Sequence, residues 1–92
     1  MIVRFYIDPE TDEPHIYNHG VSEEEVEDVL RFPGEDRPSR RNSRIAAGQT
    51  NSGRHLHVIY LVDPDPDSVF VITAYDLKGR QLAAYRKRRR KR

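Results

Sequence analysis

The sequence predicts an α+β fold, in which an antiparallel sheet of about four strands carries helices mainly on one face. Three observations support this class. Four segments alternate apolar and polar side chains, as half-buried strands do. A helix-starting motif follows the first of these segments, and a second helical pattern follows the last. The chain has 92 residues, enough for one small domain, which we place at residues 1–85 with a basic tail at residues 86–92.

The N-terminal part predicts one strand and two helical segments. Residues 2–7 alternate apolar and polar side chains and predict the first strand. Residues 14–19 then predict a single helical turn. Ser22 and Glu25 have the spacing of a capping box, in which each side chain accepts a hydrogen bond from the other's backbone N–H, so a longer helix begins here. One face of that helix is apolar: Val26, Val29 and Leu30.

The C-terminal part predicts a loop, three strands and a helix. Residues 35–43 have no apolar periodicity and predict an exposed loop. The terminal helix is expected from residue 80 to about residue 88, with Leu82 and Tyr85 directed inward. The three strands between them form a meander: residues 44–50, 54–62 and 69–75.

Alternation along the strands predicts which side chains form the core and which form an open face. The core set is Leu56, Val58, Tyr60, Val62, Phe70, Ile72 and Ala74. The open face then displays polar and titratable side chains: Arg4, Tyr6, His55, His57, Thr73 and Tyr75. At one end of this open face an apolar margin is expected to bind a protein partner or a second copy of the chain: Ile59, Leu61 and Val71.

Charge is distributed very unevenly along the chain. Residues 1–77 hold 15 acids and 7 bases, whereas residues 78–92 hold 9 bases and no acid. A cationic segment binds polyanions by releasing their condensed counterions, so we expect RNA or the ribosome as a partner. The alternatives are a disordered solubilising or targeting tail and a patch for an acidic protein. The expected RNA-binding residues are Arg80, Arg86, Lys87, Arg88, Arg89, Arg90, Lys91 and Arg92.

Composition suggests a cytoplasmic protein without a cofactor. The chain has no cysteine, which fits a reducing compartment. It has no apolar run long enough to span a membrane, and its first residues lack the pattern of a signal peptide, so no membrane partner is expected. A single small core leaves little room for a cofactor cavity.

The open face offers side chains suited to RNA cleavage without a metal ion. This reaction needs a base for the 2′-hydroxyl, an acid for the leaving 5′-oxygen and a cation for the charge on phosphorus. His57 can transfer the proton, Arg54 can bind the phosphate and Tyr75 can stack on a base or donate a proton. His55 and His57 could instead bind a metal ion, but no third ligand is placed near them, so no metal site is predicted. They could equally be ordinary surface histidines.

Three short motifs resemble the BrnT family of ribonuclease toxins, within the wider RelE-like superfamily. They are histidine-glycine-valine-serine at residues 19–22, glycine-x-threonine at residues 48–50, and glycine-arginine at residues 53–54. The resemblance covers most of residues 15–85. It implies a RelE/BrnT-like fold and a metal-independent ribonuclease toxin of a type II pair, which inhibits translation by RNA cleavage and is encoded beside an antitoxin that masks it.

Three features depart from the BrnT-like pattern, and one is the displaced aromatic residue before the first-strand aspartate, where this chain has Tyr6, Ile7 and Asp8. Tyr75 stands where that family generally carries an arginine at the end of the last strand, and Gln81 stands near where the terminal helix usually has a glutamate. A tyrosine cannot replace the charge of an arginine. The departures keep a second function open, a non-catalytic RNA- or ribosome-binding module of the same fold.

Overall fold

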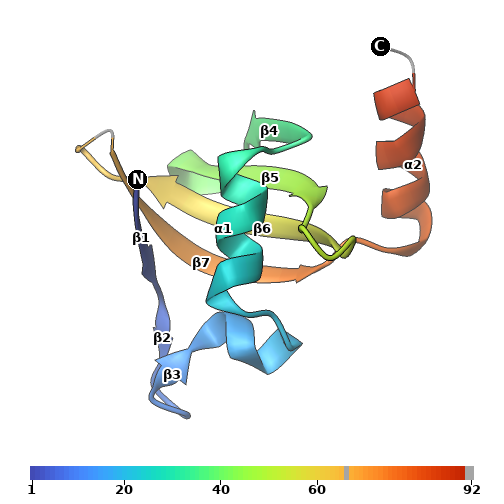
Figure 1. Cartoon of the computed structure of the whole chain (residues 1–92). Coiled ribbons are helices and arrows are strands. Elements are labelled where there is room, and N and C mark those ends of the chain that lie inside the picture. The colour runs from blue at the N-terminus through green and yellow to red at the C-terminus, as the bar shows by residue number, and fades with distance from the viewer. Residues whose placement is uncertain (66, 91–92) are drawn as a thin grey trace.

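The structure is a computed structural model of the chain and describes residues 1–65 and 67–90. A mixed five-stranded sheet forms its centre, in the order β1-β7-β6-β5-β4 (Figure 1). The elements in chain order are β1 (Ile2–Phe5), β2 (Ile7–Asp8), β3 (Glu13–Pro14), the 3₁₀ helix η1 (His15–His19), α1 (Glu23–Arg31), β4 (Glu35–Pro38), the 3₁₀ helix η2 (Arg40–Asn42), β5 (Ser43–Gln49), β6 (His55–Val62), β7 (Ser68–Asp76) and α2 (Gly79–Arg90). The α+β class is confirmed.

The prediction of an antiparallel sheet of about four strands is wrong in two respects. First, β1 pairs with β7 in parallel, with Val3 opposite Val69. Parallel neighbours need a long crossover, and here residues 6–67 separate the two strands, so no local turn signals the pairing. Second, the segment expected as a loop contains β4, which pairs with β5. β4 is an edge strand of charged residues and proline, and it therefore lacks the apolar alternation of a half-buried strand.

α1 covers one face of the sheet (Figure 1). The predicted capping box is present: the Ser22 hydroxyl accepts from the Glu25 backbone N–H at 3.2 Å, and the Glu25 carboxylate accepts from the Ser22 N–H at 3.0 Å. Val26 and Val29 are fully buried and Leu30 packs beside them. The core beneath α1 includes Ile16, Val21, Ala46, Leu56, Val58, Tyr60, Val69, Val71 and Ala74.

A bulge in β7 overturns part of the predicted core. Ile59 pairs with Thr73 but Tyr60 pairs with Val71, so Ile72 has no opposite residue and the alternation reverses there. Val71, expected at the exposed apolar margin, is fully buried and is not available to a protein partner. Phe70 and Ile72, expected in the core, are only partly buried. Val62 was also expected in the core and is exposed.

α2 does not share the face of α1, contrary to the expectation of helices mainly on one face. It stands beside the sheet (Figure 1), and its Tyr85 packs against Ala47 and Leu77, with Leu82 next to them. Ala47 follows the core residue Ala46 and therefore points to the opposite side of the sheet. Residues 86–90 of the expected tail continue α2, while residues 91–92 lie outside the described residues. Within the part of the chain that the structure describes, no helix is long and apolar enough to cross a membrane.

Candidate nucleic-acid interface

Tyr85 anchors α2 to the sheet. Its side chain is buried, and its ring meets the His55 ring edge to face with centroids 5.9 Å apart. The approach depends on a glycine, because a Cβ built on Gly34 would lie 1.9 Å from the Tyr85 hydroxyl oxygen. No other amino acid fits at position 34 unless Tyr85 moves.

Two arginines then tie the last turns of α2 to the start of β4. Arg88 makes two hydrogen bonds to the Glu35 carboxylate, one of them from Nη2 at 2.9 Å, and this contact is the main reason that the pKa of Glu35 is lowered. Arg89 donates from Nη1 to the Gly34 carbonyl at 2.8 Å. Paired guanidinium–carboxylate hydrogen bonds fix orientation as well as distance, so the basic end of α2 has a defined position.

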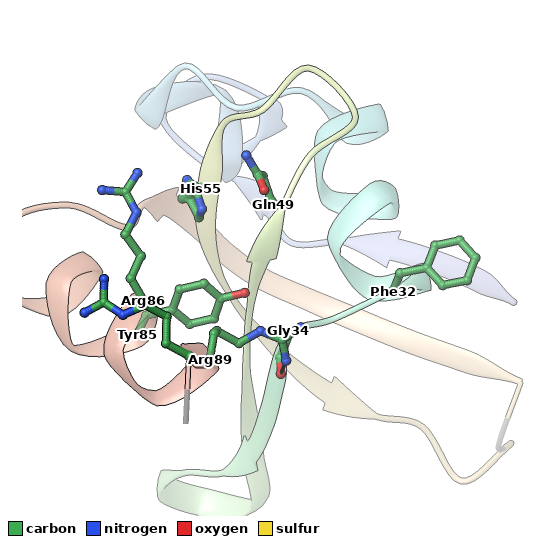
Figure 2. A pocket seen from close by; sticks show the side chains of 8 residues that line it. Phe32, Gly34, Gln49, His55, Tyr85, Arg86 and Arg89 are labelled. Carbon is green, nitrogen blue, oxygen red and sulfur yellow. Dashed lines mark hydrogen bonds between the residues drawn. The ribbon is translucent and has the colours of Figure 1, made fainter. Parts of the chain in front are cut away.

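The contact of α2 with the sheet leaves a pocket of about 450 Å³ (Figure 2). Its walls combine aromatic rings with guanidinium, imidazole and amide groups, the side chains that bind phosphates and stack on unpaired bases in single-stranded RNA. Figure 2 shows Arg86 and Arg89 near the Tyr85 ring, with Gln49 and His55 on the adjoining strands. The lining residues are Phe32, Gly34, Gln49, His55, Tyr85, Arg86, Arg89 and Arg90.

The pocket holds three of the eight predicted RNA-binding residues, Arg86, Arg89 and Arg90. Arg80 and Lys87 are exposed elsewhere on α2, and Arg88 lies against Glu35. Lys91 and Arg92 lie outside the described residues. Within the pocket, burial and then the charge of Arg86 lower the pKa of His55, so its imidazole is neutral at pH 7 and offers one donor and one acceptor.

Two of the three predicted catalytic residues lie together. His57 and Tyr75 are opposite each other on β6 and β7, with ring centroids 5.5 Å apart and the rings nearly perpendicular. His57 is only 5% exposed, and its Nδ1 has no hydrogen-bond partner among the residues that the structure describes. Burial and then the charge of Arg37 lower the pKa of His57 and hold its ring in the neutral form.

Arg54 does not join His57 and Tyr75. Strand alternation places its side chain on the α1 side of the sheet, opposite to His57. There its Nε donates to Asp76 at 2.7 Å, and its Nη1 donates to Glu25 at 3.1 Å and to the Gly20 carbonyl at 2.8 Å. The guanidinium is thus held by two carboxylates and by the backbone carbonyls of His19 and Gly20.

A second group of rings lies around η1, and its two histidines were not among the predicted site residues. Tyr6, His15, His19 and Tyr75 follow one another with centroid distances of 6.2, 5.4 and 6.3 Å. His15 Nδ1 lies 3.2 Å from an Asp8 carboxylate oxygen. The sequence signal was the spacing of His15 and His19, since residues four apart meet on one side of a helical turn.

This second group opens into a pocket of about 490 Å³ at the junction of η1, the end of β7 and the start of α2. Its lining residues are His19, Tyr75, Asp76, Lys78 and Gln81. The bond from Arg54 is the largest cause of the lowered pKa of Asp76, and the charges of Lys78 and His19 add to it. The pocket therefore contains an imidazole, a phenol, an ammonium group and an ionised carboxylate.

Residues 15–76 match the protein family described as a domain of unknown function, DUF4258. This match covers more than half of the chain. The chain belongs to the DUF4258 family. No curated protein and no solved structure matches it.

The DUF4258 region runs from η1 to β7 and contains Arg54, His57, Tyr75 and both histidines of η1. β1 and the basic helix α2 lie outside it. The family description gives no activity, so the resemblance to BrnT toxins stays a prediction. Ile59 and Leu61, the other two residues of the expected partner margin, are half-buried on the face opposite α1.

Proposed function

We propose that this DUF4258 protein binds single-stranded RNA along α2. The supporting observation is the pocket in which Arg86, Arg89 and Arg90 lie beside Tyr85 and His55. Guanidinium groups bind phosphate oxygens with paired N–H donors, and aromatic side chains stack on bases irrespective of sequence. Arg86 and Arg90 are four residues apart on the helix and so project from the same side, toward one stretch of RNA backbone.

The salt dependence of binding tests this proposal. Each phosphate neutralised on a single strand contributes about 0.7 to the slope of log affinity against log salt concentration. Arg86→Gln and Arg90→Gln should each reduce the slope by about that amount, measured by fluorescence anisotropy with a labelled RNA oligonucleotide. Arg4→Gln is the matched control, because Arg4 pairs with Asp63 at the β1 edge of the sheet, four strands away from β4.

Phe32 provides a separate test of base contact. This residue is 78% exposed and lines the pocket, so its ring can stack on an unpaired base. Phe32→Ala should weaken RNA binding by roughly 1–3 kcal/mol without changing the salt slope. Unchanged slopes in both arginine variants, together with unchanged affinity in Phe32→Ala, would overturn RNA binding by this pocket.

A second candidate function is the ribonuclease toxin that the BrnT resemblance implies. It is favoured by His19, Tyr75 and Lys78 around the pocket at the start of α2, since RNA bound along α2 would pass this pocket. In that reading the protein acts in the cytoplasm on RNA or on the ribosome, and an antitoxin helix or a second copy of the chain covers Ile59 and Leu61. Induced expression followed by growth measurement and mapping of RNA 5′ ends tests the toxin activity. Co-purification with the product of a neighbouring gene tests the antitoxin.

A further inference from the structure

We propose that His15 and His19 of η1 form the proton-transferring pair of an RNA-cleaving site, completed by Tyr75 and Lys78. The inference rests on the proposed RNA binding and names the reacting groups. Arg54 and His57 are not part of this site, because Arg54 is held by two carboxylates and His57 is only 5% exposed. η1 instead brings two accessible imidazoles to the edge of the sheet beside Tyr75.

The Asp8–His15 contact fixes how His15 can act. Asp8 accepts hydrogen bonds from the Glu10 backbone N–H at 2.9 Å and from the Asn18 amide at 2.7 Å, and these bonds together with His15 lower the pKa of its carboxyl. An ionised Asp8 favours the tautomer in which His15 Nδ1–H donates a hydrogen bond to the carboxylate, and the Asn18 amide nitrogen, 3.3 Å from Nδ1, then donates to Asp8 alone. Nε2 of His15 then has a free lone pair, as a general base requires. Asp8 is a positioning residue in this arrangement.

His19 occupies the position next to both His15 and the pocket. Its ring lies 5.4 Å from that of His15 and 6.3 Å from that of Tyr75, and it lines the pocket with Lys78. Lys78 provides a cation at this pocket, and it immediately precedes α2. RNA held by Arg86 and Arg90 can therefore continue along the helix to this pocket. The titratable and charged groups around the two histidines are Tyr6, Asp8, Arg54, Tyr75, Asp76 and Lys78.

The reaction is an internal transesterification of RNA. The 2′-oxygen attacks the adjacent phosphorus while His15 accepts the 2′-hydroxyl proton. The bond from phosphorus to the 5′-oxygen breaks, and protonated His19 donates a proton to that oxygen. Lys78 stabilises the additional negative charge on the phosphoryl oxygens, and Tyr75 contacts a base or a phosphate. The products are a 2′,3′-cyclic phosphate and a 5′-hydroxyl, and the pair returns to its starting protonation when the protons are exchanged with water.

The test compares cleavage and binding in the same full-length variants. The substrates are a single-stranded RNA oligonucleotide of mixed sequence and a DNA oligonucleotide of the same sequence, which lacks the 2′-hydroxyl. His15→Gln and His19→Gln should each slow RNA cleavage by roughly 100-fold or more, while RNA affinity stays within about twofold of the wild type. Tyr17→Phe is the matched control, since Tyr17 lies between them on η1 but directs its hydroxyl to Glu23.

A pH profile separates catalysis from a structural effect. The wild-type rate should be bell-shaped against pH, because one histidine must be neutral and the other protonated. Each single glutamine variant should lose one limb of the profile, and Asp8→Asn should slow cleavage with both limbs retained, because Asp8 orients His15 without transferring a proton itself. Circular dichroism identifies a variant that does not fold. If His15→Gln fails to fold, the exposed His19 and the Asp8→Asn profile still test the pair.

Each outcome bears on one proposal or on both. RNA binding without cleavage by the wild type overturns this inference and leaves the proposed binding function standing. Cleavage that both histidine variants retain, or equal cleavage of the DNA, also overturns it. A wild type that neither binds nor cleaves RNA overturns the proposed function as well. Loss of cleavage with retained binding and the expected cyclic phosphate end supports the inference.

Discussion

Arg54 has a side chain suited to phosphate binding, but in this fold it makes internal contacts instead. Its guanidinium contacts Asp76, Glu25 and the Gly20 carbonyl. Glu25 also completes the capping box with Ser22, so Arg54 connects the start of α1 to the end of β7. Its contribution is therefore to the stability of the η1–α1 junction, which supports the histidines of η1.

Replacing this arginine should lower stability considerably more than replacing an exposed one. Arg54→Ala removes charge-assisted hydrogen bonds at a half-buried site and leaves Glu25 and Asp76 without their partner, so we expect a loss of about 1.5–3 kcal/mol. Arg4→Ala removes an ion pair to Asp63 in which the arginine is 55% exposed, and it should cost about 0–1 kcal/mol. Urea unfolding of both variants measures the difference. Equal losses would contradict the assignment of Arg54 to the fold.

His57 should make stability sensitive to mild acid. Its pKa is lowered by burial and then by Arg37, so the folded state keeps the neutral ring while the unfolded chain binds a proton near the ordinary value of about 6.5. The stability that this provides is complete above the unfolded pKa and is lost as pH falls toward the folded pKa, by at most about 1.4 kcal/mol per pH unit. Urea unfolding between pH 7 and 5 should show this loss in the wild type. His57→Phe keeps an aromatic ring beside Tyr75 and should show a smaller loss, and an equal loss would assign the effect to other groups.

At the residue scale, local pairs could be predicted and distant ones could not. Ser22 and Glu25 are three residues apart, so their spacing alone specifies the capping box. The partners of Arg54 lie 22 and 29 positions away, and no periodic pattern relates such positions. The placement of His57 beside Tyr75 could be predicted from the sequence, because both residues lie on strands of a predicted hairpin. Whether Arg54, His57 and Tyr75 act on RNA stays a prediction.

At the element scale, the sequence predicts strands and helices better than their partners. The meander of β5, β6 and β7 was predicted because short turns connect its strands. The bulge at Ile72 inserts one residue into the pairing, and no glycine in the sequence signals it. The core and open faces of residues 69–72 were therefore assigned in reverse. The docking of α2 was also not predictable in detail, because it depends on the absence of a side chain at Gly34.

The docking of α2 can be tested through Gly34. The Cβ of Gly34→Ala would overlap the Tyr85 hydroxyl, and overpacking of this kind costs about 1–3 kcal/mol. We expect a lower unfolding temperature and weaker RNA binding, since displacement of Tyr85 alters the pocket. The loss should be smaller in a Tyr85→Leu background, which removes the overlapping atoms, and a double-mutant cycle measures this coupling. Additive losses would show that Tyr85 does not pack against Gly34 in solution.

At the scale of the whole molecule, an acidic body carries a basic helix, and the two partly neutralise each other. Glu35 is the carboxylate of the body that pairs with Arg88 of α2. Arg86 and Arg90 line the pocket and form no ion pair among residues 1–65 and 67–90. The uneven charge along the sequence predicted a basic tail at residues 86–92, but it could not indicate that residues 86–90 are helical and docked.

The Arg88–Glu35 pair should therefore compete with RNA. Glu35→Gln removes the negative charge beside Arg88, and with it the attraction that holds this guanidinium at the start of β4. We expect RNA to bind roughly two- to tenfold more tightly at low salt, with a salt slope steeper by up to about 0.7 because Arg88 becomes available to a phosphate. Glu24→Gln also removes one negative charge, but in the first turn of α1 and not beside α2, and it therefore controls for net charge. Anisotropy titrations at several salt concentrations measure both quantities. Weaker RNA binding by Glu35→Gln would contradict competition between Glu35 and RNA for Arg88. It would mean that the docked position of α2 contributes more to RNA affinity than the free charge of Arg88.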